Sequence, residues 1–529
     1  MTDEPSTAET SPSLRLSDEH PLRAAAVSWL LSRINYERVA DVPYNERQLK
    51  LDRMRQLLTR LGQPDAGLKI VHVAGTKGKG STSAMIAGIL TAAGYRTGLF
   101  TSPHLERIEE RFAVDGKPCT SAELVALVER VRPVILAMDA EANGAASLRD
   151  SGPTASERLP YDDTPTFFEI VTAIALLHFV ERQVDAAVLE VGLGGRLDST
   201  NVCLPAVSVI TSISFDHTKQ LGNTLAAIAG EKAGIIKRGV PVVCGVTDAE
   251  PQAAIAEVAR EHGCRLIQLG REFVYEYFGF RISDCGLELF QSEIRNPQSA
   301  IRTIDFNYHV PGREFALTAL PLAMLGRHQA ANAAIAVATV AELRHQGWCI
   351  STAAIRDGLG NTKMPGRVEV IPGEPLVVLD VAHNPASARA LIDALAELPA
   401  ASRRTLILSI SRDKDVRAIA AELSPHFDRI IATQFRENPR AIAADELAEI
   451  IRSVLATSDV VDSSGSNTGI ASGIVSAGKS SYSPREINVC AIPSDAWKHA
   501  CITARSGELV CIAGSLFLTA ELRPIVCGR

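Results

Sequence analysis

The sequence predicts an α/β protein with two parallel-sheet domains, the second smaller than the first. Near the N-terminal end, an apolar run at Ile70–Ala74 leads through a glycine-rich turn into a segment with helical spacing. From Pro165 onward, short apolar strands alternate with helical segments, and this alternation is typical of a parallel sheet covered on both faces. A second series of the same kind begins after residue 365.

The domain boundaries follow from these changes of pattern along 529 residues. We expect residues 1–21 to be a disordered tail, because they are polar and rich in Ser, Thr and Pro. Residues 22–347 should form the first domain, 348–365 a hinge, and 366–529 the second domain. A low-complexity stretch at about 457–484 interrupts the second domain and is expected to be a loop.

The composition is that of a soluble globular protein, with 46% apolar and 22% charged residues. The net charge of −7 gives no basic field for nucleic acid or anionic lipid. Ten cysteines without a C-x-x-C pair indicate reduced thiols rather than a disulfide framework or a zinc site. No signal-peptide core and no apolar run of about 18 residues is found, so we expect a cytoplasmic protein without a membrane partner.

Periodicity and turn residues place the elements of the first domain. Helices are expected at Arg23–Ile34, Asn45–Leu61, Ser81 to about Gly94, Ser121–Met138, Thr166–Arg182, Thr224–Lys237 and His328–His345. Strands are expected at Ile70–Ala74, Thr97–Thr101, Ala186–Val191, Val207–Ile213 and Pro241–Val246. Glu141–Thr164 is rich in Ala, Ser, Gly, Asp and Pro and should be a loop. Phe273–Leu320 carries aromatics and alternation, which favours a small antiparallel addition.

The second domain shows the same alternation after a hinge at Trp348–Gly366. Its strands are expected at Leu376–Val381, Thr405–Ile410, Arg429–Thr433, Ile487–Ile492 and Leu509–Ala513, with helices between them. Thr457–Pro484 is the low-complexity loop.

The turn after the first long strand has the composition of a phosphate-binding loop. Val71–Thr82 reads V-H-V-A-G-T-K-G-K-G-S-T, a strand, a glycine-rich turn and a helix start. Glycine lets the backbone approach an anion closely, and three are available at Gly75, Gly78 and Gly80. The unpaired N–H groups and the positive dipole end of the following helix would point at that anion.

Side chains in the same turn suit a nucleotide. Lys79 can place a positive charge on the phosphates, and Ser81 or Thr82 can offer a hydroxyl to Mg²⁺. The match to G-x-x-x-x-G-K-[ST] is imperfect, since Val73 replaces the first glycine and Gly80 separates the lysine from the serine. A tight glycine turn without a ligand is the alternative.

Three further groups in the first domain could take part in chemistry. Glu190 ends an apolar strand, where carboxylate ligands of Mg²⁺ gather in parallel sheets, although a surface glutamate at a strand end is the alternative. Asp216 and His217 follow the next strand, and His217 could complete a metal site, although a capping or core pair is commoner. Lys232 lies inside a helix, and its spacing alone favours a surface ion pair.

The second domain opens with similar groups. Asp380 and His383 stand at a strand end in L-D-V-A-H-N-P, with Arg367 just upstream. They could reach a nucleotide held by the first domain. The alternative, which does not exclude that role, is a strand-to-helix turn with Asn384 as N-cap and Pro385 at the first helical position.

Ten motifs occur in order along the chain: G-T-K-G-K-G-S-T, T-S-P-H-L, T-F-F-E, E-V-G-L-G-G-R-L-D-S-T-N-V, D-H-T-K-Q-L-G-N-T, E-K-A-G-I-I-K, G-R-H-Q-A-A-N-A, M-P-G-R, D-V-A-H-N-P and G-S-L-F-L. Taken together, they resemble those of the folylpolyglutamate synthase and dihydrofolate synthase family, within the Mur ligase superfamily. The resemblance extends from about Asn45 to about Arg523. It implies a P-loop-type parallel-sheet ATPase domain followed by a smaller Rossmann-like α/β domain.

The resemblance also implies an activity, an ATP-dependent amide ligase. ATP would phosphorylate a carboxyl of dihydropteroate or (tetrahydro)folate, and the amine of L-glutamate would attack the acyl phosphate, releasing ADP and phosphate. A poor electrophile thus becomes a good one, and the phosphate charge needs Lys79 and Mg²⁺. Two domains closing over the site would exclude water. The family expectation is a monomer with small-molecule substrates and no nucleic acid.

Site residues carry over from the family position by position. Nucleotide contacts would be Gly75, Thr76, Gly78, Lys79, Gly80, Ser81, Thr82, Asn332, Arg367 and Asp380. Ser81, Glu190 and His217 resemble the Mg²⁺ ligands, and Lys232 resembles a lysine that carries CO₂ as a carbamate and holds a second Mg²⁺. The catalytic residues would be Lys79, Lys232 and His383. The pterin surface would include Thr166, Phe168, Glu169, Leu197 and Asp198.

Two departures from the family pattern and two rival functions stay open. Lys77 stands where the family usually has Asn, and the insertion at 457–484 is unusual. One rival is a Mur-type ligase that joins amino acids to a cell-wall nucleotide; T-F-F-E and the lack of an added N-terminal UDP-binding domain speak against it. The other is a nucleotide-binding regulator without a ligase step, which would leave Arg367, Asp380 and His383 idle.

Overall fold

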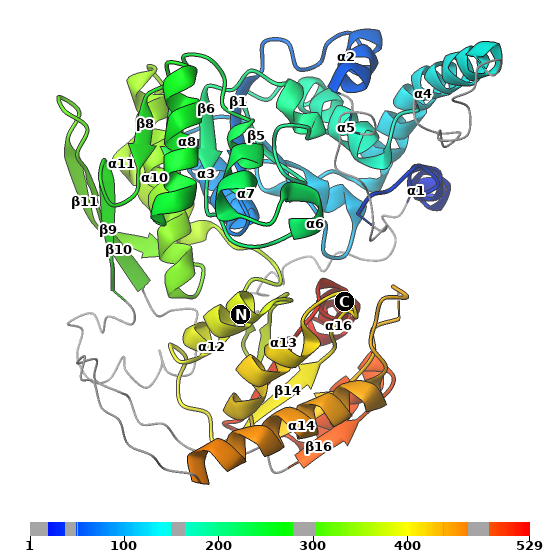
Figure 1. Cartoon of the computed structure of the whole chain (residues 1–529), viewed down its shortest axis with the longest axis vertical. Coiled ribbons are helices and arrows are strands. Elements are labelled where there is room, and N and C mark those ends of the chain that lie inside the picture. The colour runs from blue at the N-terminus through cyan, green and yellow to red at the C-terminus, as the bar shows by residue number, and fades with distance from the viewer. Residues whose placement is uncertain are drawn as a thin grey trace, which may run out of the picture.

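The protein folds around two separate β-sheets whose strands are mostly parallel, one in the upper and one in the lower part of Figure 1. This computed structural model describes residues 20–37, 49, 51–149, 164–278, 302–436, 438–463 and 486–528. We call residues 20–361 the first lobe and residues 366–528 the second lobe. The α/β fold predicted from the sequence is confirmed. In the described part of the chain, no helix is long and apolar enough to cross a bilayer.

An eight-stranded sheet forms the centre of the first lobe. In spatial order its strands are β4 (Lys117–Pro118), β3 (Phe112–Val114), β2 (Thr97–Phe100), β5 (Ala186–Glu190), β1 (Lys69–Ala74), β6 (Val207–Ile210), β7 (Val242–Cys244) and β8 (Leu266–Gln268). Strands β2, β5, β1, β6, β7 and β8 pair in parallel with their neighbours in this order. Strands β3 and β4 form an antiparallel edge next to β2.

Helices cover both faces of this sheet, which explains why its strands are almost continuously apolar. The helices of the first lobe are α1 (Arg23–Leu31), α2 (Leu51–Arg60), α3 (Lys79–Ala92), α4 (Ser121–Arg149), α5 (Phe167–Glu181), α6 (Thr218–Leu221), α7 (Leu225–Ala233), α8 (Ala249–Glu261), α10 (Arg327–His345) and α11 (Thr352–Asn361). Alternate residues of β5 face different cores: Val188 packs with α3 and α10, and Leu189 packs with α1, α2, α4 and α5.

A three-stranded antiparallel sheet stands at the edge of the first lobe. Its order is β11 (Phe315–Leu322), β10 (Arg302–Tyr308) and β9 (Phe273–Phe278), and its apolar face joins the core under α10. The antiparallel addition predicted for Phe273–Leu320 is therefore confirmed within the described residues.

The second lobe has a six-stranded sheet. In spatial order its strands are β12 (Glu369–Ile371), β13 (Leu376–Leu379), β17 (Leu509–Ala513), β14 (Arg404–Leu408), β15 (Arg429–Ala432) and β16 (Glu486–Val489). Its helices are α12 (Pro385–Leu395), α13 (Val416–Leu423), α14 (Ala444–Ser463), α15 (Pro493–Thr503) and α16 (Leu516–Val526). Helices α12, α13 and α14 cover one face, and α15 and α16 cover the other.

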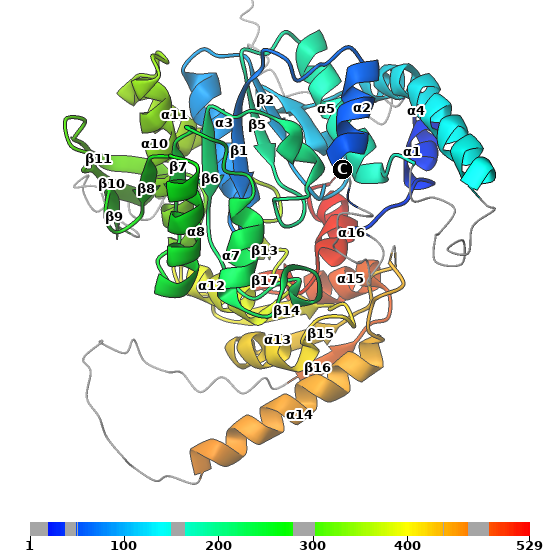
Figure 2. The ribbon, with the colours of Figure 1, turned by 45° about the horizontal axis from the view of Figure 1, so that its top comes forward.

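The two lobes touch through charged side chains. Figures 1 and 2 place α12 and α16 on the side of the second lobe that faces the first. Arg523 of α16 donates to Glu369 through Nε at 2.8 Å and also binds Glu106 of the first lobe. At the antiparallel sheet, Tyr277 Oη donates to Glu397 Oε2 at 2.5 Å.

The structure corrects three expectations about loops. Helix α4 continues to Arg149, so the first part of the loop expected at 141–164 is helical, and residues 150–163 lie outside the described part. Helix α14 likewise runs to Ser463 into the expected loop at 457–484. The hinge expected at 348–365 contains α11, whose Ile355 and Leu359 belong to the first core. The tail expected at 1–21 lies almost wholly outside the described residues.

Candidate active site

The glycine-rich turn between β1 and α3 has a backbone conformation and close contacts that require glycine at two positions. Gly78 is the N-cap of α3 with φ 81°, and a Cβ there would lie 2.3 Å from Asn332 Oδ1. Gly75 has φ 150°, and a Cβ there would lie 2.0 Å from Thr211 Oγ1. A side chain at either position would force a neighbour to move, so both positions need glycine. A backbone without side chains at these points can approach a ligand closely.

Hydroxyl groups of the segment that directly follows β6 hold this loop. Thr211 Oγ1 donates to the carbonyl of Lys77 at 2.6 Å, and Ser212 Oγ both accepts from the amide of Lys77 and donates to its carbonyl, at 3.0 Å each. Thr76 Oγ1 exchanges hydrogen bonds with the backbone of Ser214. No side chain caps α3, so its first N–H groups are available to an anion.

Glu190 ends β5 beside the start of α3. Both of its carboxylate oxygens lie 3.5 Å from the point where a Cβ on Gly80 would stand, and one accepts from the amide of Ser102 at 3.1 Å. The residue is 4% exposed. Burial raises the pKa of Glu190, while the positive charges of Lys79 and Arg367 oppose that rise. A buried carboxylate thus lies in the field of cations from both lobes.

The residues expected to hold Mg²⁺ are only partly assembled. Ser81 is buried and directly follows Gly80, and its hydroxyl points at Met364 Sδ over 3.9 Å, a weak contact that a better partner could replace. Hydroxyl and carboxylate oxygens suit a hard cation that takes its other ligands from phosphate and water. The side chain of His217 is half exposed, and its Nε2 lies 3.9 Å from Asp216 Oδ1. Within the described ranges no three His, Cys, Asp or Glu side chains form a ready-made metal cluster.

Lys232 is not the surface lysine that its spacing alone favoured. It lies in the last turn of α7 and is 4% exposed. Burial, reinforced by the charge of Lys79, lowers the pKa of Lys232 to about 7, with Asp216 and Asp198 acting in the opposite direction. A substantial fraction of this amine is therefore neutral at neutral pH, because the pKa of a lysine in water is about 10.4.

Asp216 lies in the electrostatic field of both lobes. Burial raises the pKa of Asp216, but the positive charges of His217 and His383 in their protonated forms, and of Lys414 and Lys79, outweigh burial and lower it overall. Lys414 and His383 belong to the second lobe. The loop after β6 therefore faces the carboxyl ends of β13 and β14.

Asp380 fixes the backbone where the second lobe begins. Its carboxylate accepts from the amides of Val368 and Ala382 at 2.8 and 2.7 Å. Burial raises the pKa of Asp380 to about 6, and the charge of Arg367 limits the rise. Because both carboxylate oxygens are bonded to the chain, Asp380 holds the segment that carries Arg367.

The ring of His383 is oriented by the backbone through one of its two nitrogens. Its Nδ1 lies 2.9 Å from the carbonyl oxygen of Val381, which can only accept, so Nδ1 carries the proton and Nε2 is an acceptor. Burial lowers the pKa of His383, which keeps the ring neutral at pH 7. The predicted cap next to it is also present, since Asn384 accepts from the amide of Ser387 at 2.9 Å and Pro385 is the first residue of α12.

The residues expected to form a pterin surface meet at the start of α5. The ring of Phe168 lies directly over Gly192, because a Cβ on that glycine would stand 2.5 Å from Phe168 Cζ. Thr166 is the N-cap of α5 and Glu169 completes its capping box. The Glu169 carboxylate also receives Arg53 Nε of α2 at 2.9 and 3.0 Å.

The carboxylates of Asp198 and Glu169 both accept hydrogen bonds from other groups of the protein. Asp198 accepts from the amides of Gly192 and Leu193 at 3.0 Å each and from the amide and hydroxyl of Thr200. Leu197 beside it is 8% exposed. These carboxylates support the surface that Phe168 forms.

Two residues at the site, Met364 of the M-P-G-R motif and Lys414, were not among the site residues proposed from the sequence. Met364 packs against Gly80 and Ser81 from the segment that joins the lobes, and Lys414 reaches the field of Asp216 from the loop after β14. Both come from chain segments far from the phosphate loop, so only the tertiary structure brings them to it.

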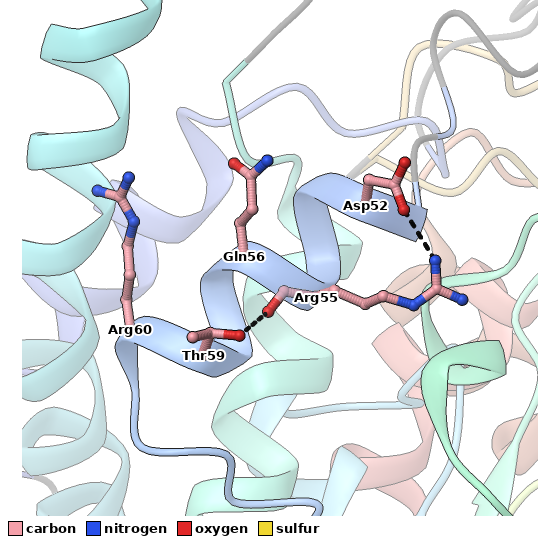
Figure 3. A pocket seen from close by; sticks show the side chains of 5 residues that line it. All are labelled: Asp52, Arg55, Gln56, Thr59 and Arg60. Atoms are coloured by element: carbon pink, nitrogen blue, oxygen red, sulfur yellow. Dashed lines mark hydrogen bonds and ion pairs between the residues drawn. The ribbon is translucent and has the colours of Figure 1, made fainter.

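A surface hollow elsewhere lacks these features. It measures about 430 Å³ and is lined by Asp52, Arg55, Gln56, Thr59 and Arg60 (Figure 3). All five belong to the outer face of α2, and Arg55 pairs with Asp52 at 2.8 Å. It is a surface of one helix rather than a site where several elements converge.

Comparison with known proteins places this arrangement in a family. The model of the Mur ligase middle domain matches residues 151–340, and that of the Mur ligase glutamate ligase domain matches residues 366–516. The dihydrofolate synthase/folylpolyglutamate synthase of Bacillus subtilis is 33% identical over 475 residues, which cover 89% of this chain and 94% of that protein. The protein of the same description from Mycobacterium tuberculosis is 35% identical over 437 residues, 79% of this chain and 81% of that protein.

Solved structures agree over almost the whole chain. A folylpolyglutamate synthase of Mycobacterium tuberculosis complexed with ADP superposes with a TM-score of 0.74 at 28% identity, over 96% of this chain and 98% of that one. E. coli FolC in complex with DHPP and ADP gives a TM-score of 0.69 at 28% identity, over 95% and 98%. Because these relatives are 33–35% identical over most of their length and both Mur ligase domain models match, the chain belongs to the dihydrofolate synthase/folylpolyglutamate synthase family of Mur ligases.

Proposed function

We propose that this protein is an ATP-dependent ligase that joins L-glutamate to a pteroate or folate carboxyl through an acyl phosphate. The observation that carries the proposal is the position of Glu190. It is a buried carboxylate beside the open start of α3, and it lies in the fields of Lys79 from the first lobe and Arg367 from the second. This arrangement suits a triphosphate held between the two lobes.

The first half of the reaction is phosphoryl transfer. The amides at the start of α3 would bind the phosphates of ATP, and Lys79 would neutralise charge on the transferred group. Asn332, which fills the space over Gly78, would contact the nucleoside. An oxygen of the substrate carboxylate attacks the terminal phosphorus, the bond to the bridging oxygen breaks, and ADP leaves. Ser81 and Glu190 would hold Mg²⁺, which when bound offsets the negative charge of the phosphates.

The second half is amide formation. The amine of glutamate attacks the carbonyl carbon of the acyl phosphate, and inorganic phosphate leaves with the electrons of the broken C–O bond. The amine must lose a proton as it attacks. His383 fits this step because its Nε2 is an acceptor and its ring is neutral.

Lys232 suits a carbamate better than a free ammonium. A neutral amine attacks the carbon of CO₂, an N–C bond forms, and a proton leaves the nitrogen. The burial that lowers the pKa of Lys232 to about 7 favours this step, since it needs the neutral form. The product is an anion whose hard oxygens suit a second Mg²⁺, whereas an ammonium beside Lys79 would repel one.

The pterin would stack on Phe168, whose ring is seated on Gly192. Glu169 and Asp198 would support that ring indirectly. The carboxylate of Asp198 holds the backbone of Gly192 and Leu193 beneath the ring, and that of Glu169 binds Arg53 at the start of the helix that carries Phe168. E. coli FolC has been solved in complex with DHPP and ADP and also with ADP without folate substrate, which supports a folate-type acceptor.

A coupled assay tests the function directly. Purified protein with ATP and Mg²⁺ should release ADP only when L-glutamate is present together with dihydropteroate or tetrahydrofolate. ADP release that needs a cell-wall nucleotide instead would support the rival Mur-type ligase. Nucleotide binding with no glutamate-dependent turnover on either acceptor would support a regulator.

A further inference from the structure

A buried chain of hydrogen bonds links β1 to the turn under Phe168. His72 of β1 has its Nε2 2.8 Å from Thr200 Oγ1, and that hydroxyl donates to Asp198 Oδ1 at 2.5 Å. The other oxygen of Asp198 accepts from the amides of Gly192 and Leu193. His72 and Thr200 are fully buried, and Asp198 is 5% exposed.

Burial raises the pKa of Asp198, but hydrogen bonds from Thr200, Leu193 and Gly192 oppose that rise and favour the ionised carboxylate. With Asp198 ionised, the direction of every bond in this chain follows. A threonine hydroxyl has one proton, and Thr200 gives it to the carboxylate of Asp198, because an ionised carboxylate can only accept. Thr200 must then accept from His72, so Nε2 of His72 carries a proton. Nδ1 of His72 is buried and has no hydrogen-bond partner among the described residues, which fits a neutral ring with an unprotonated Nδ1. Protonating Nδ1 would bury an N–H group with no acceptor.

We propose that His72 is a positioning residue for the acceptor substrate: through Thr200 it orients Asp198, which holds the Gly192–Leu193 turn that seats Phe168. This inference rests on the proposed function. Asp198 is a buried carboxylate that relies on four donors, and the Thr200 hydroxyl is the one donor whose direction depends on a second side chain. Losing it leaves a buried anion short of a hydrogen bond, so the turn must shift to find another.

The phosphate loop is supported separately. Thr211 and Ser212 hold it through the backbone of Lys77. Among the described residues, the hydrogen bonds of Thr211 and Ser212 and those of the His72 chain have no member in common. Disturbing His72 or Thr200 should therefore affect binding of the pteroate or folate acceptor and spare ATP.

Kinetics with matched variants test the proposal. Thr200→Val removes the hydroxyl at nearly constant volume, and Thr200→Ser keeps it. We expect Thr200→Val to raise the KM for the acceptor by about tenfold, the size of a lost hydrogen bond to a charged group, with the KM for ATP unchanged. Thr200→Ser should stay near wild type. Equal rises in both KM values, or no rise in Thr200→Val, would overturn the proposal.

A second pair of variants examines His72 itself. His72→Leu should reproduce the acceptor defect, and the double variant with Thr200→Val should be no worse than either single one, because all interrupt the same chain. His178 of α5 is an equally buried histidine, 2% exposed, and His178→Leu should leave the acceptor KM unchanged. Additive defects in the double variant would contradict a shared chain.

The ring tautomer gives a test that needs no turnover. In the ¹⁵N NMR spectrum of the wild-type protein, His72 should show a protonated Nε2 and an unprotonated Nδ1 at pH 7. The opposite tautomer, or a doubly protonated ring, would overturn the inference even if His72→Leu failed to fold. Absence of ligase activity in the wild type with the expected tautomer would instead refute the proposed function.

Discussion

At the scale of single residues, two lysines of the phosphate loop differ in what surrounds them. Lys79 begins α3 and acts on Glu190, Asp216 and Lys232 through its charge. Lys77 stands where the family resemblance leads us to expect asparagine, and its backbone rather than its side chain is held by Thr211 and Ser212. Burial lowers the pKa of Lys77, with Asp216 opposing.

The first prediction separates the roles of these lysines. Lys79→Ala should abolish ATP turnover, because the charge on the transferred phosphoryl group loses its partner, while the circular dichroism spectrum stays unchanged. Lys77→Asn should keep activity, since asparagine also supplies the backbone groups that the loop needs. Near-normal activity of Lys79→Ala would contradict the phosphate-loop assignment, and total loss in Lys77→Asn would give Lys77 a role of its own.

The second prediction concerns the buried amine. Lys232→Ala should be folded and nearly inactive, and short carboxylic acids should restore part of its activity by placing an anion in the vacated space. Lys232→Arg should fail too, because a guanidinium keeps its charge and cannot form a carbamate. Activity of each variant with and without added acid is the measurement. A fully active Lys232→Arg would show that no carbamate is needed.

At the scale of elements, the start of α5 depends on a buried ion pair with α2. Arg53 and Glu169 are each 6% exposed, and the carboxylate also caps α5. On the same helix, Arg55 pairs with Asp52 on the surface, with side chains 56% and 87% exposed. The two arginines allow a matched comparison of buried and exposed pairs.

The third prediction uses this comparison. Arg53→Ala leaves Glu169 buried without its cation and should lower the free energy of unfolding by about 3 kcal/mol. Arg55→Ala should change it by less than about 1 kcal/mol. Denaturant titrations of the two variants give the answer, and equal effects would show that the buried pair is not needed to hold α5.

The sequence predicted strands better than the ends of helices. The strand β5 is flanked by clear turns and is apolar throughout, so Ala186–Val191 came within one residue of the observed Ala186–Glu190. Helix α4 runs past Met138 through Glu141, Ala142 and Gly144, residues whose mixed propensities suggested a loop. Helix α11 was missed because its small residues, among them Gly358, look like a linker, whereas Gly358 lets α11 lie directly on Ile89 of α3.

The candidate site shows the same limit at longer range. Glu190, Lys79 and Arg367 could be proposed from motifs, because each stands next to a strand end or a turn. The buried state of Lys232 could not, since the helix pattern around it is the same for a surface lysine. The partnership of His72 with Thr200 joins residues 128 positions apart and depends on the pairing of β1 with its neighbours.

At the scale of the whole molecule, the site lies where the two lobes meet. Arg523 binds Glu369 of its own lobe and Glu106 of the other, and Glu369 also accepts from the amide of Gly366 at 2.8 Å. The segment that carries Arg367 is thus tied to both lobes. The monomeric state implied by the family resemblance stays a prediction.

The fourth prediction tests whether the second lobe reaches the nucleotide. Arg367→Ala should raise the KM for ATP and slow turnover, because a cation in the field of Glu190 is lost. Arg389 is an exposed arginine of α12 paired with Glu422, and Arg389→Ala should behave like wild type. A defect of Arg367→Ala confined to the KM for glutamate would place this residue on the amino-acid side instead.

The most direct test of the central claim follows an oxygen atom. If the acceptor carboxyl is activated as an acyl phosphate, one of its oxygens must leave with the phosphate. Turnover of a dihydropteroate or tetrahydrofolate labelled with oxygen-18 in the reacting carboxyl, together with ATP and L-glutamate, should give phosphate that carries the label. Unlabelled phosphate formed alongside the glutamate amide would contradict the proposed mechanism.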